Sequence, residues 1–501
     1  MPVRRENRPF TKEESRMQKN DPQKVKNIAA IILIVIMCMV IAGLIALIVK
    51  TVKNDGTKAT EVPSNTSISN NTPNNTDSLI PVETPSPTPK GQEFFTDAPT
   101  DEQTAAPTPT NAPATATPTL GPTATPRGDI KVTGTVSVLA AGDNLFHNGI
   151  LIEAKEKAKA LGNGTDFSFD FIYTNVKSRI QAADISVINQ ESLILPKRYL
   201  SNNISRYIRS DGSFVAPEEL TQTLIDIGFD VMDKANNHML DMGSGGMKWG
   251  VDYMNTVTGI KAVGAYYDEA GSEQVCVIEK NGVKIAFLAY TYGTNVPQWK
   301  ASWEAPEFPY YVPLPEDEKM IADLKRADDA ADFTVVLIHW GTEQQERPND
   351  DQRRIAKVLA ENGAGIIIGH HPHCLQSIEY VSDGKGGRII CAYSLGTLVS
   401  NMSAEKNMLA GFFEFNVNKW SDGSATVSDV RLTPTVFYYD TEYKNSKIYY
   451  LSEMTNELCA SHGIKNYPKE SENKNKMTRA TMIAYLQKTI DNEFLAAEYR
   501  K

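Results

Sequence analysis

Six of the chain's seven histidines lie in short polar clusters that follow predicted strands. The five clusters read Gly142-Asp143-Asn144-Leu145-Phe146-His147, Asn189-Gln190-Glu191, Asn236-Asn237-His238 with Asp241, His339-Trp340-Gly341-Thr342-Glu343, and Gly369-His370-His371-Pro372-His373. In open α/β sheets, ligands bind beyond the carboxyl ends of the strands. If the preceding strands share a sheet, we expect the five clusters to converge on one site.

The side chains in these clusters are typical of a divalent metal centre. Imidazoles, carboxylates and amide oxygens suit Zn, Mn or Fe. Two ions about 3.5–4 Å apart need a bridging carboxylate and further ligands for each ion. The sequence therefore predicts two divalent ions, held by Asp143, His147, Glu191, Asn237, His339, His371 and His373.

Each cluster alone also has a plainer interpretation. A Gly-Asp pair after a strand is often a turn, Asn-Asn-His can cap a helix, and His339 can be a satisfied core histidine. The pair His371 and His373 is a stronger signal, because two imidazoles two residues apart can reach one centre. The whole set favours a metal site, and Cys374 is interpreted as structural.

His238 follows the predicted ligand Asn237 and suits a different task. There it can protonate a leaving oxygen or stabilise developing charge, so we predict it as catalytic. Asp241 either fixes the tautomer of His238 or caps the following segment. Together the residues predict metal-assisted hydrolysis, most naturally at a phosphoryl centre.

Strand and helix patterns alternate from Thr135 onward and predict an α/β layered domain. The expected strands cover residues 136–141, 185–189, 230–235, 283–291, 333–339, 366–369, 388–393, 412–417 and 425–438. The expected helices cover residues 173–182, 217–227, 316–330, 350–361 and 477–499. Asn349 is the expected N-cap of the helix at 350–361.

The N-terminal part of the chain has a different composition. Residues 28–49 form an uninterrupted apolar run of 22 residues, long enough at ~1.5 Å per residue to cross a bilayer. Residues 1–26 carry eight Lys and Arg against four acids, which predicts a cytoplasmic tail and an extracellular remainder. A cleaved signal peptide is the alternative, but its apolar core is normally only about 7–15 residues.

Composition also bounds the rest of the chain. Residues 51–128 hold 18 Thr and 13 of the 27 Pro, which predicts a disordered tether or stalk. The expected organisation is a basic tail (1–27), a single transmembrane anchor (28–49), a linker (50–130), a large α/β domain that carries the polar clusters (131–440) and a helical extension (441–501). The net charge is −10 and no basic patch follows the N-terminus, which argues against nucleic-acid binding. The five Cys form no C-x-x-C pair.

The order of motifs resembles the CapA-type poly-γ-glutamate capsule synthesis proteins over residues 134–400. The resemblance rests on the five clusters and on Ser394-Leu395-Gly396, in the family's order. It implies a calcineurin-like metallophosphatase sandwich of two β-sheets flanked by helices. It also implies a membrane-anchored extracellular protein that works with other membrane subunits of capsule synthesis. The first motif departs from the Asp-x-His of general metallophosphatases, since Asp143 and His147 are four residues apart.

Three functions are compatible with these motifs. The first is a metal-dependent hydrolase that acts on an anionic envelope polymer, poly-γ-glutamate, or on a phosphorylated intermediate. Glu343, Arg347 and His370 are then expected to line the substrate cleft, although Glu343 and Arg347 can also belong to a solvated loop. The alternative is a non-catalytic subunit that binds and exports the polymer. A third is a phosphatase or nucleotidase that shares only the fold.

Overall fold

The computed structural model describes residues 129–295, 312–467 and 477–501. The predicted tail and anchor, and the linker up to residue 128, lie outside these described residues. Among the helices that the structure does describe, none is both long and apolar enough to cross a bilayer. All described elements belong to one compact unit of the chain.

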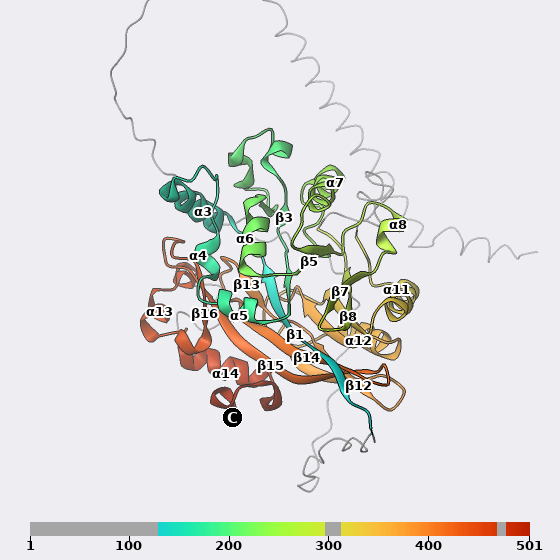
Figure 1. Ribbon diagram of the computed structural model, residues 1–501. Helices are drawn as coiled ribbons and strands as arrows, with labels where there is room; N and C mark the ends of the chain where they lie inside the picture. Colours follow the sequence, from blue (N-terminus) through green and yellow to red (C-terminus); the bar gives the residue numbers. More distant parts are fainter. Residues whose placement is uncertain (1–128, 296–311, 468–476) are drawn as a thin grey trace, which may run out of the picture. The chain divides into compact units, whose positions relative to one another are not determined.

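The first sheet is mixed and has the strand order β16-β15-β14-β1-β2-β5-β6, with β13 also pairing with β1. Strands β1, β2, β5 and β6 are parallel neighbours, whereas β14, β15 and β16 add an antiparallel half beside β1. Figure 1 shows β14 and β15 next to β1. The bounds are β1 Val132–Asn144, β2 Ile185–Asn189, β5 Val231–Asp233, β6 Lys261–Val263, β13 Thr397–Val399, β14 Leu409–Trp420, β15 Ala425–Tyr438 and β16 Lys447–Tyr450.

The second sheet has the strand order β11-β12-β10-β9-β8-β7. Its four central strands are parallel, and its two edge strands are antiparallel to their neighbours. The bounds are β7 Cys276–Lys280, β8 Val283–Thr291, β9 Phe333–His339, β10 Ile366–His370, β11 Ile378–Ser382 and β12 Arg388–Ala392. A small separate pair joins β3, Leu193–Ile194, to β4, Val215–Ala216.

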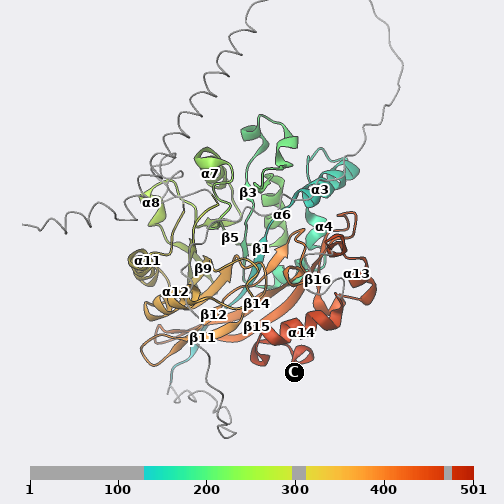
Figure 2. The same ribbon diagram turned by 180° about the vertical axis from the view of Figure 1, so that it is seen from behind.

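Helices flank the sheets, and Figure 2 shows α11 and α12 beside the second sheet. The α-helices are α3 Asn148–Leu161, α4 Asp170–Tyr173, α5 Lys177–Ala182, α6 Glu219–Ile227, α7 Gly243–Met254, α8 Glu269–Ser272, α11 Asp317–Ala330, α12 Asp350–Glu361, α13 Asn456–Ser461 and α14 Arg479–Thr489. The 3₁₀ helices are η1 Lys197–Leu200, η2 Ile204–Tyr207, η3 Glu405–Met408, η4 Leu451–Glu453, η5 Gly463–Asn466, η6 Asn492–Phe494 and η7 Ala497–Tyr499.

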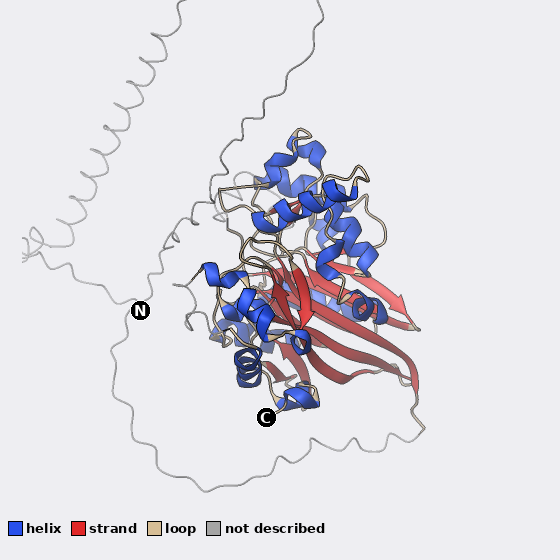
Figure 3. Ribbon diagram, turned by 90° about the vertical axis from the view of Figure 1, so that its left-hand side faces the viewer, coloured by secondary structure: helices blue, strands red, loops and turns tan. Residues whose placement is uncertain are grey.

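The alternation of side chains along β8 shows how the layers pack. Ile285 and Phe287 point into the large core shared with the first sheet. Their neighbours Ala286 and Leu288 point the other way, into a second core with Leu324 of α11 and residues of α12. Both faces of the strand are therefore buried, as is usual for parallel strands. Figure 3 shows the helices, in blue, lying against the strands, in red. The predicted mixed α/β fold, with two sheets flanked by helices, is confirmed.

Two helix predictions were wrong in extent. The expected helix at 173–182 is two short helices, α4 and α5, separated by a turn. The expected helix at 477–499 ends at Thr489, because Ile490 has an extended backbone and the chain continues in 3₁₀ turns. The buried Leu495 there forms a bridge with Leu432 of β15. Tertiary packing thus accounts for the apolar residues that the sequence assigned to one helix.

The strand register brings the polar clusters to the same level of each sheet. In the first sheet, Asp143, Asn189 and Asp233 lie side by side at the carboxyl ends of β1, β2 and β5. In the second sheet, His339 lies between Thr291 and His370 at the ends of β8, β9 and β10. The two rows supply the residues of the site described next.

Candidate metal centre

Asp143 is held in place by a close approach of two chain segments. Its backbone N–H donates to the carbonyl of Gly396 at 3.0 Å. A Cβ atom on the preceding Gly142 would lie 2.0 Å from the same oxygen, so no side chain fits there. The Asp143 carboxylate is fully buried, and accepts from Asn189 Nδ2 at 2.8 Å and contacts His373 Nδ1 at 2.9 Å.

Glu191 lies at the centre of the site, just after β2. Its Oε1 lies 3.5 Å from His339 Nε2, 3.5 Å from His373 Nε2 and 3.8 Å from His238 Nε2. These distances exceed those of good hydrogen bonds, and both carboxylate oxygens are buried without a hydrogen-bond partner. Burial, opposed by the charge of His373, raises the pKa of Glu191 to about 8.

The three imidazoles come from the second sheet and the turn after β10. His339 Nε2 lies 3.2 Å from His371 Nδ1 and 2.9 Å from the Asn237 amide oxygen. His371 and His373 have positive φ angles of 95° and 54°. Such backbone is costly for residues other than Gly and clusters at functional sites. The backbone of His373 is held in part by Asn407, whose Nδ2 donates to the His373 carbonyl at 2.7 Å.

The protonation preferences of these groups suit cation binding. Burial lowers the pKa of His371 to about 3 and holds that of His339 well below its usual range, so both imidazoles are neutral donors. Burial alone would lower the pKa of His373, but Glu191 and Asp143 raise it to about 10. Without a metal, a proton on His373 therefore takes the place of a cation between two buried carboxylates.

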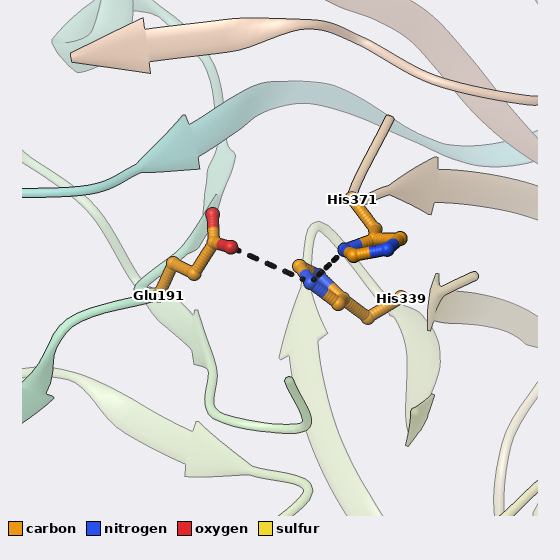
Figure 4. A group of neighbouring side chains, drawn as sticks. All are labelled: Glu191, His339 and His371. Atoms are coloured by element: carbon orange, nitrogen blue, oxygen red, sulfur yellow. Dashed lines mark hydrogen bonds and ion pairs between the residues drawn. The ribbon is translucent and has the colours of Figure 1, made fainter. Parts of the chain in front are cut away.

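Three overlapping groups of side chains could each hold a divalent ion. Within each group the ligand atoms lie within 4.8 Å of one another; the groups are Glu191-His339-His371, Asp143-Glu191-His373, and Glu343-His371-His373. Figure 4 shows the first, with His339 between Glu191 and His371. The first two share Glu191, whose two unpartnered oxygens fit a bridging carboxylate. The set fits a divalent cation because it combines imidazole nitrogens with carboxylate oxygens, and both oxygens of Glu191 lack a hydrogen-bond partner.

His238 is held at the edge of this cluster. Its Nδ1 contacts Asp241 Oδ2 at 2.8 Å, and the same oxygen accepts from the backbone N–H of Phe214 at 2.6 Å. The Phe214 ring packs edge-on against His238, with ring centroids 4.8 Å apart. Burial alone would lower the pKa of His238, but Asp241 raises it. The Asp241 carboxylate thus orients His238 and favours its protonated form.

The remaining predicted residues lie around the cluster. His147 also packs edge-on against Phe214, with ring centroids 4.8 Å apart, and belongs to none of the three groups. His370 is 1% exposed and its Nδ1 lies 3.4 Å from Asp143 Oδ1, so it faces the interior. Glu343 and Arg347 are exposed on the loop between β9 and α12.

The structure adds residues that the sequence did not single out as site residues. Asn189 Nδ2 contacts both Asp143 of the first sheet and His339 Nδ1 of the second, at 2.8 and 3.4 Å. Asp233 is fully buried, with one oxygen unpartnered, and burial raises its pKa to about 7. Asn295 Nδ2 lies 3.2 Å from His238 Nδ1. The sequence placed Asp233 inside the strand expected at 230–235, whereas β5 ends at Asp233, so no separate signal pointed to it.

Comparison with known proteins places this site in a family. The family model described as bacterial capsule synthesis protein, PGA_cap, matches residues 137–402, more than half of the 501-residue chain. The chain belongs to this family. The matched range includes every residue of the three ligand groups.

Two curated relatives carry names from capsule synthesis. The PGA biosynthesis protein CapA of Bacillus subtilis is 30% identical over 266 residues, covering 52% of this chain and 65% of that protein. The capsule biosynthesis protein CapA of Bacillus anthracis is 27% identical over 275 residues, covering 53% of this chain and 61% of that protein. The match thus spans less than two thirds of either relative, while the predicted CapA-type family is confirmed.

Solved structures show weaker likeness. A putative 5'-nucleotidase from Staphylococcus aureus has 15% identity and a TM-score of 0.36, covering 60% of this chain and 54% of its own. A phosphatase from Mycoplasma pneumoniae has 12% identity and a TM-score of 0.35, covering 61% and 94%. Because these scores are low, the fold rests on the strand order and packing of this chain alone.

Proposed function

We propose that this protein is a metal-dependent hydrolase whose two divalent ions share Glu191. The observation that supports this most is the Glu191 carboxylate itself. It is buried, neither oxygen has a hydrogen-bond partner, and it belongs to two groups of candidate ligands. An unpaired buried carboxylate is expensive for a fold unless a ligand compensates it. The nitrogen and oxygen donors favour Mn, Fe or Zn.

Bound ions would supply an activated water and polarise a substrate oxygen. The chain's own residues would handle the proton. Asp241 holds Nδ1 of His238, which leaves Nε2, 3.8 Å from Glu191, directed toward the cluster. A protonated His238 can then donate to the leaving oxygen. Asn189 would orient His339 at Nδ1, which leaves Nε2, near Glu191 and the Asn237 amide oxygen, to bind an ion.

The substrate we propose is an anionic envelope polymer such as poly-γ-glutamate, or a phosphorylated intermediate of its synthesis. The names of the two Bacillus relatives support a role in capsule synthesis. The exposed cation Arg347 and the proposed ions would attract an anion to the site.

Metal content and turnover test this proposal together. The purified full chain, loaded with Mn²⁺, should retain about two equivalents, in keeping with a two-ion site. It should hydrolyse a phosphomonoester or a γ-glutamyl amide. His339→Ala should lose metal and turnover, whereas His238→Gln should lose turnover and keep the metal. A folded wild-type protein that binds no divalent metal would refute the hydrolase.

We also propose that residues 28–49 anchor the protein, with residues 1–27 in the cytoplasm and the described domain outside, next to other membrane subunits of capsule synthesis. The apolar run and the basic tail support this topology. Protease added to intact cells should digest the domain, and deletion of residues 28–49 should release the protein from membranes. A protease-resistant domain would contradict the orientation.

A non-catalytic role in binding and exporting the polymer is the second candidate. It is favoured by the relatives' names, which refer to biosynthesis rather than hydrolysis. Capsule production by cells carrying only Glu191→Gln decides between the two, because an export subunit should tolerate the loss of turnover.

A further inference from the structure

One carboxylate of the candidate centre faces solvent. Glu343 lies on the loop between β9 and α12, and its ligand atom lies within 4.8 Å of those of His371 and His373. Both histidines are buried, at 3% and 2% exposure, whereas Glu343 is exposed. Within the described residues, the Glu343 carboxylate has no hydrogen-bond donor or ion-pair partner. The Glu343 carboxylate therefore faces solvent on one side and the two histidines of the centre on the other.

Glu343 lies next to one histidine from each of the two groups that share Glu191. His371 belongs to the Glu191-His339 group, and His373 belongs to the Asp143-Glu191 group. A substrate that contacts both ions of such a site must present its anionic oxygens to both groups at once. Coming from solvent, it would need the position that the Glu343 carboxylate now has.

Tyr292 marks the same entrance to the centre. It is 44% exposed and its ring centroid lies 4.6 Å from that of His371. Burial first, and the charge of Glu343 second, raise the pKa of Tyr292. The negative charge of Glu343 therefore acts on the solvent side of the cluster, where an incoming anion would meet it.

The backbone on both sides of Glu343 is fixed. A Cβ on Gly341, which has a φ of 86°, would lie 2.6 Å from Gln352 Oε1, so the loop packs tightly there. On the other side, Gln344 N donates to the Pro372 carbonyl at 2.7 Å, and the Gln345 carbonyl accepts from Gln376 at 2.8 Å. Only the side chain of Glu343 is thus free to leave the centre.

We propose that Glu343 is an exchangeable carboxylate that occupies the place of the substrate's anionic group, so that an anion binds the metal-loaded centre by displacing it. This inference rests on the proposed function, because it requires ions held by the two Glu191 groups. It gives Glu343 a competing role, in place of the attractive substrate contact expected from the sequence.

Calorimetric titration with inorganic phosphate tests the inference on the Mn²⁺-loaded full chain. Glu343→Gln should keep its metal and bind phosphate about fivefold more tightly, because the competing negative charge is removed. This gain in phosphate affinity should be smaller at high salt, because salt screens the charge of Glu343 in the wild type. Asp350→Asn is the matched control, since it removes an exposed negative charge from the first turn of α12, and it should leave phosphate affinity unchanged.

The outcomes separate this inference from the proposed function. Unchanged or weaker phosphate binding by a metal-loaded Glu343→Gln overturns the inference and leaves the hydrolase intact. Loss of an ion from Glu343→Gln at saturating Mn²⁺ also overturns it, because Glu343 would then be an obligatory ligand. A wild-type protein that binds no Mn²⁺ overturns both the inference and the proposed function.

Discussion

Two buried glutamates of the first sheet have opposite surroundings. Glu191, beyond the end of β2, is 1% exposed and has no hydrogen-bond partner for either oxygen. Glu414, within β14, is 9% exposed. Its oxygens accept from Arg179 at 2.7 and 3.0 Å, from Arg431 at 3.2 and 3.3 Å, and from Thr433 at 2.6 Å.

The pKa shifts of the two carboxyls follow this difference. Burial raises the pKa of Glu191 to about 8. Burial has the same tendency at Glu414, but hydrogen bonds from Arg179 and Arg431 outweigh it and lower the pKa. The antiparallel half of the sheet thus satisfies the buried charge of Glu414 internally, whereas Glu191 in the parallel half has no hydrogen-bond partner and, without a metal, only the nearby charge of His373 offsets its burial. Within this one sheet, Glu414 is therefore a structural residue and Glu191 is a candidate metal ligand.

The largest expected effect comes from removing the charge of Glu191. Glu191→Gln should weaken Mn²⁺ binding at least ~100-fold, because even the outer partners of metal ligands account for about 10- to 100-fold in affinity. Equilibrium dialysis of both proteins measures this difference. If the variant bound Mn²⁺ as tightly as the wild type, Glu191 would not be a metal ligand, and in this respect it would not differ from Glu414.

The same variant should be more stable than the wild type once the metal is removed. A carboxyl with a raised pKa favours its neutral form in the folded state, so folding stability falls as pH rises from about 4.5 to about 8. A Gln side chain does not ionise, so the folding stability of Glu191→Gln does not fall in this way as pH rises. Melting temperatures of the two metal-free proteins at pH 5 and pH 9 should therefore diverge only at the higher pH.

Glu414→Gln should show the reverse pattern. Loss of charged hydrogen bonds to two arginines should lower the free energy of unfolding by about 2 kcal/mol. The Mn²⁺ affinity should stay that of the wild type. Urea denaturation and equilibrium dialysis on the same preparation check both parts, and a fall in metal affinity would show that the two regions are coupled.

A histidine outside the centre extends the comparison to pH. His462 is buried, its Nε2 contacts the Phe437 carbonyl at 2.9 Å, and burial lowers its pKa to about 4. Because the folded state keeps it neutral, its stabilising contribution is present above about pH 6.5 and is lost as pH falls toward 4, by up to about 1.4 kcal/mol per pH unit. Unfolding free energies at pH 6.5 and 4.5 should differ less in His462→Gln than in the wild type.

The smallest effect is expected at an exposed carboxylate. Glu361 forms an i,i+4 ion pair with Lys357 at the end of α12, and their side chains are 36% and 64% exposed. Solvent screens such pairs, so Glu361→Gln should change the unfolding free energy by less than about 0.5 kcal/mol. A larger change, measured by urea denaturation, would mean that the effects of substituting the three glutamates do not follow their degree of burial.

The sequence predicted best where burial alone decides structure. The strands β2, β8, β9 and β15 and the helix α12 have the predicted bounds, because long apolar runs or a clear cap define them. Short strands such as β6 and β13 were missed, since three residues carry no periodicity. Six of the seven predicted ligands lie together because they follow neighbouring strands. His147 belongs to none of the ligand groups, although it lies four residues after Asp143, so spacing in the sequence does not reveal which residues share a group.

The close contact between Gly142 and Gly396 sets an order for making the centre. Asp143 takes its position from the Gly396 carbonyl, about 250 residues later in the chain, and β13 pairs with β1 at Asp143. During synthesis, all of the proposed metal ligands are therefore part of the nascent chain before Asp143 can take its final position. A chain that ends before residue 396 would therefore carry every proposed ligand but lack the Gly396 carbonyl that holds the backbone of Asp143.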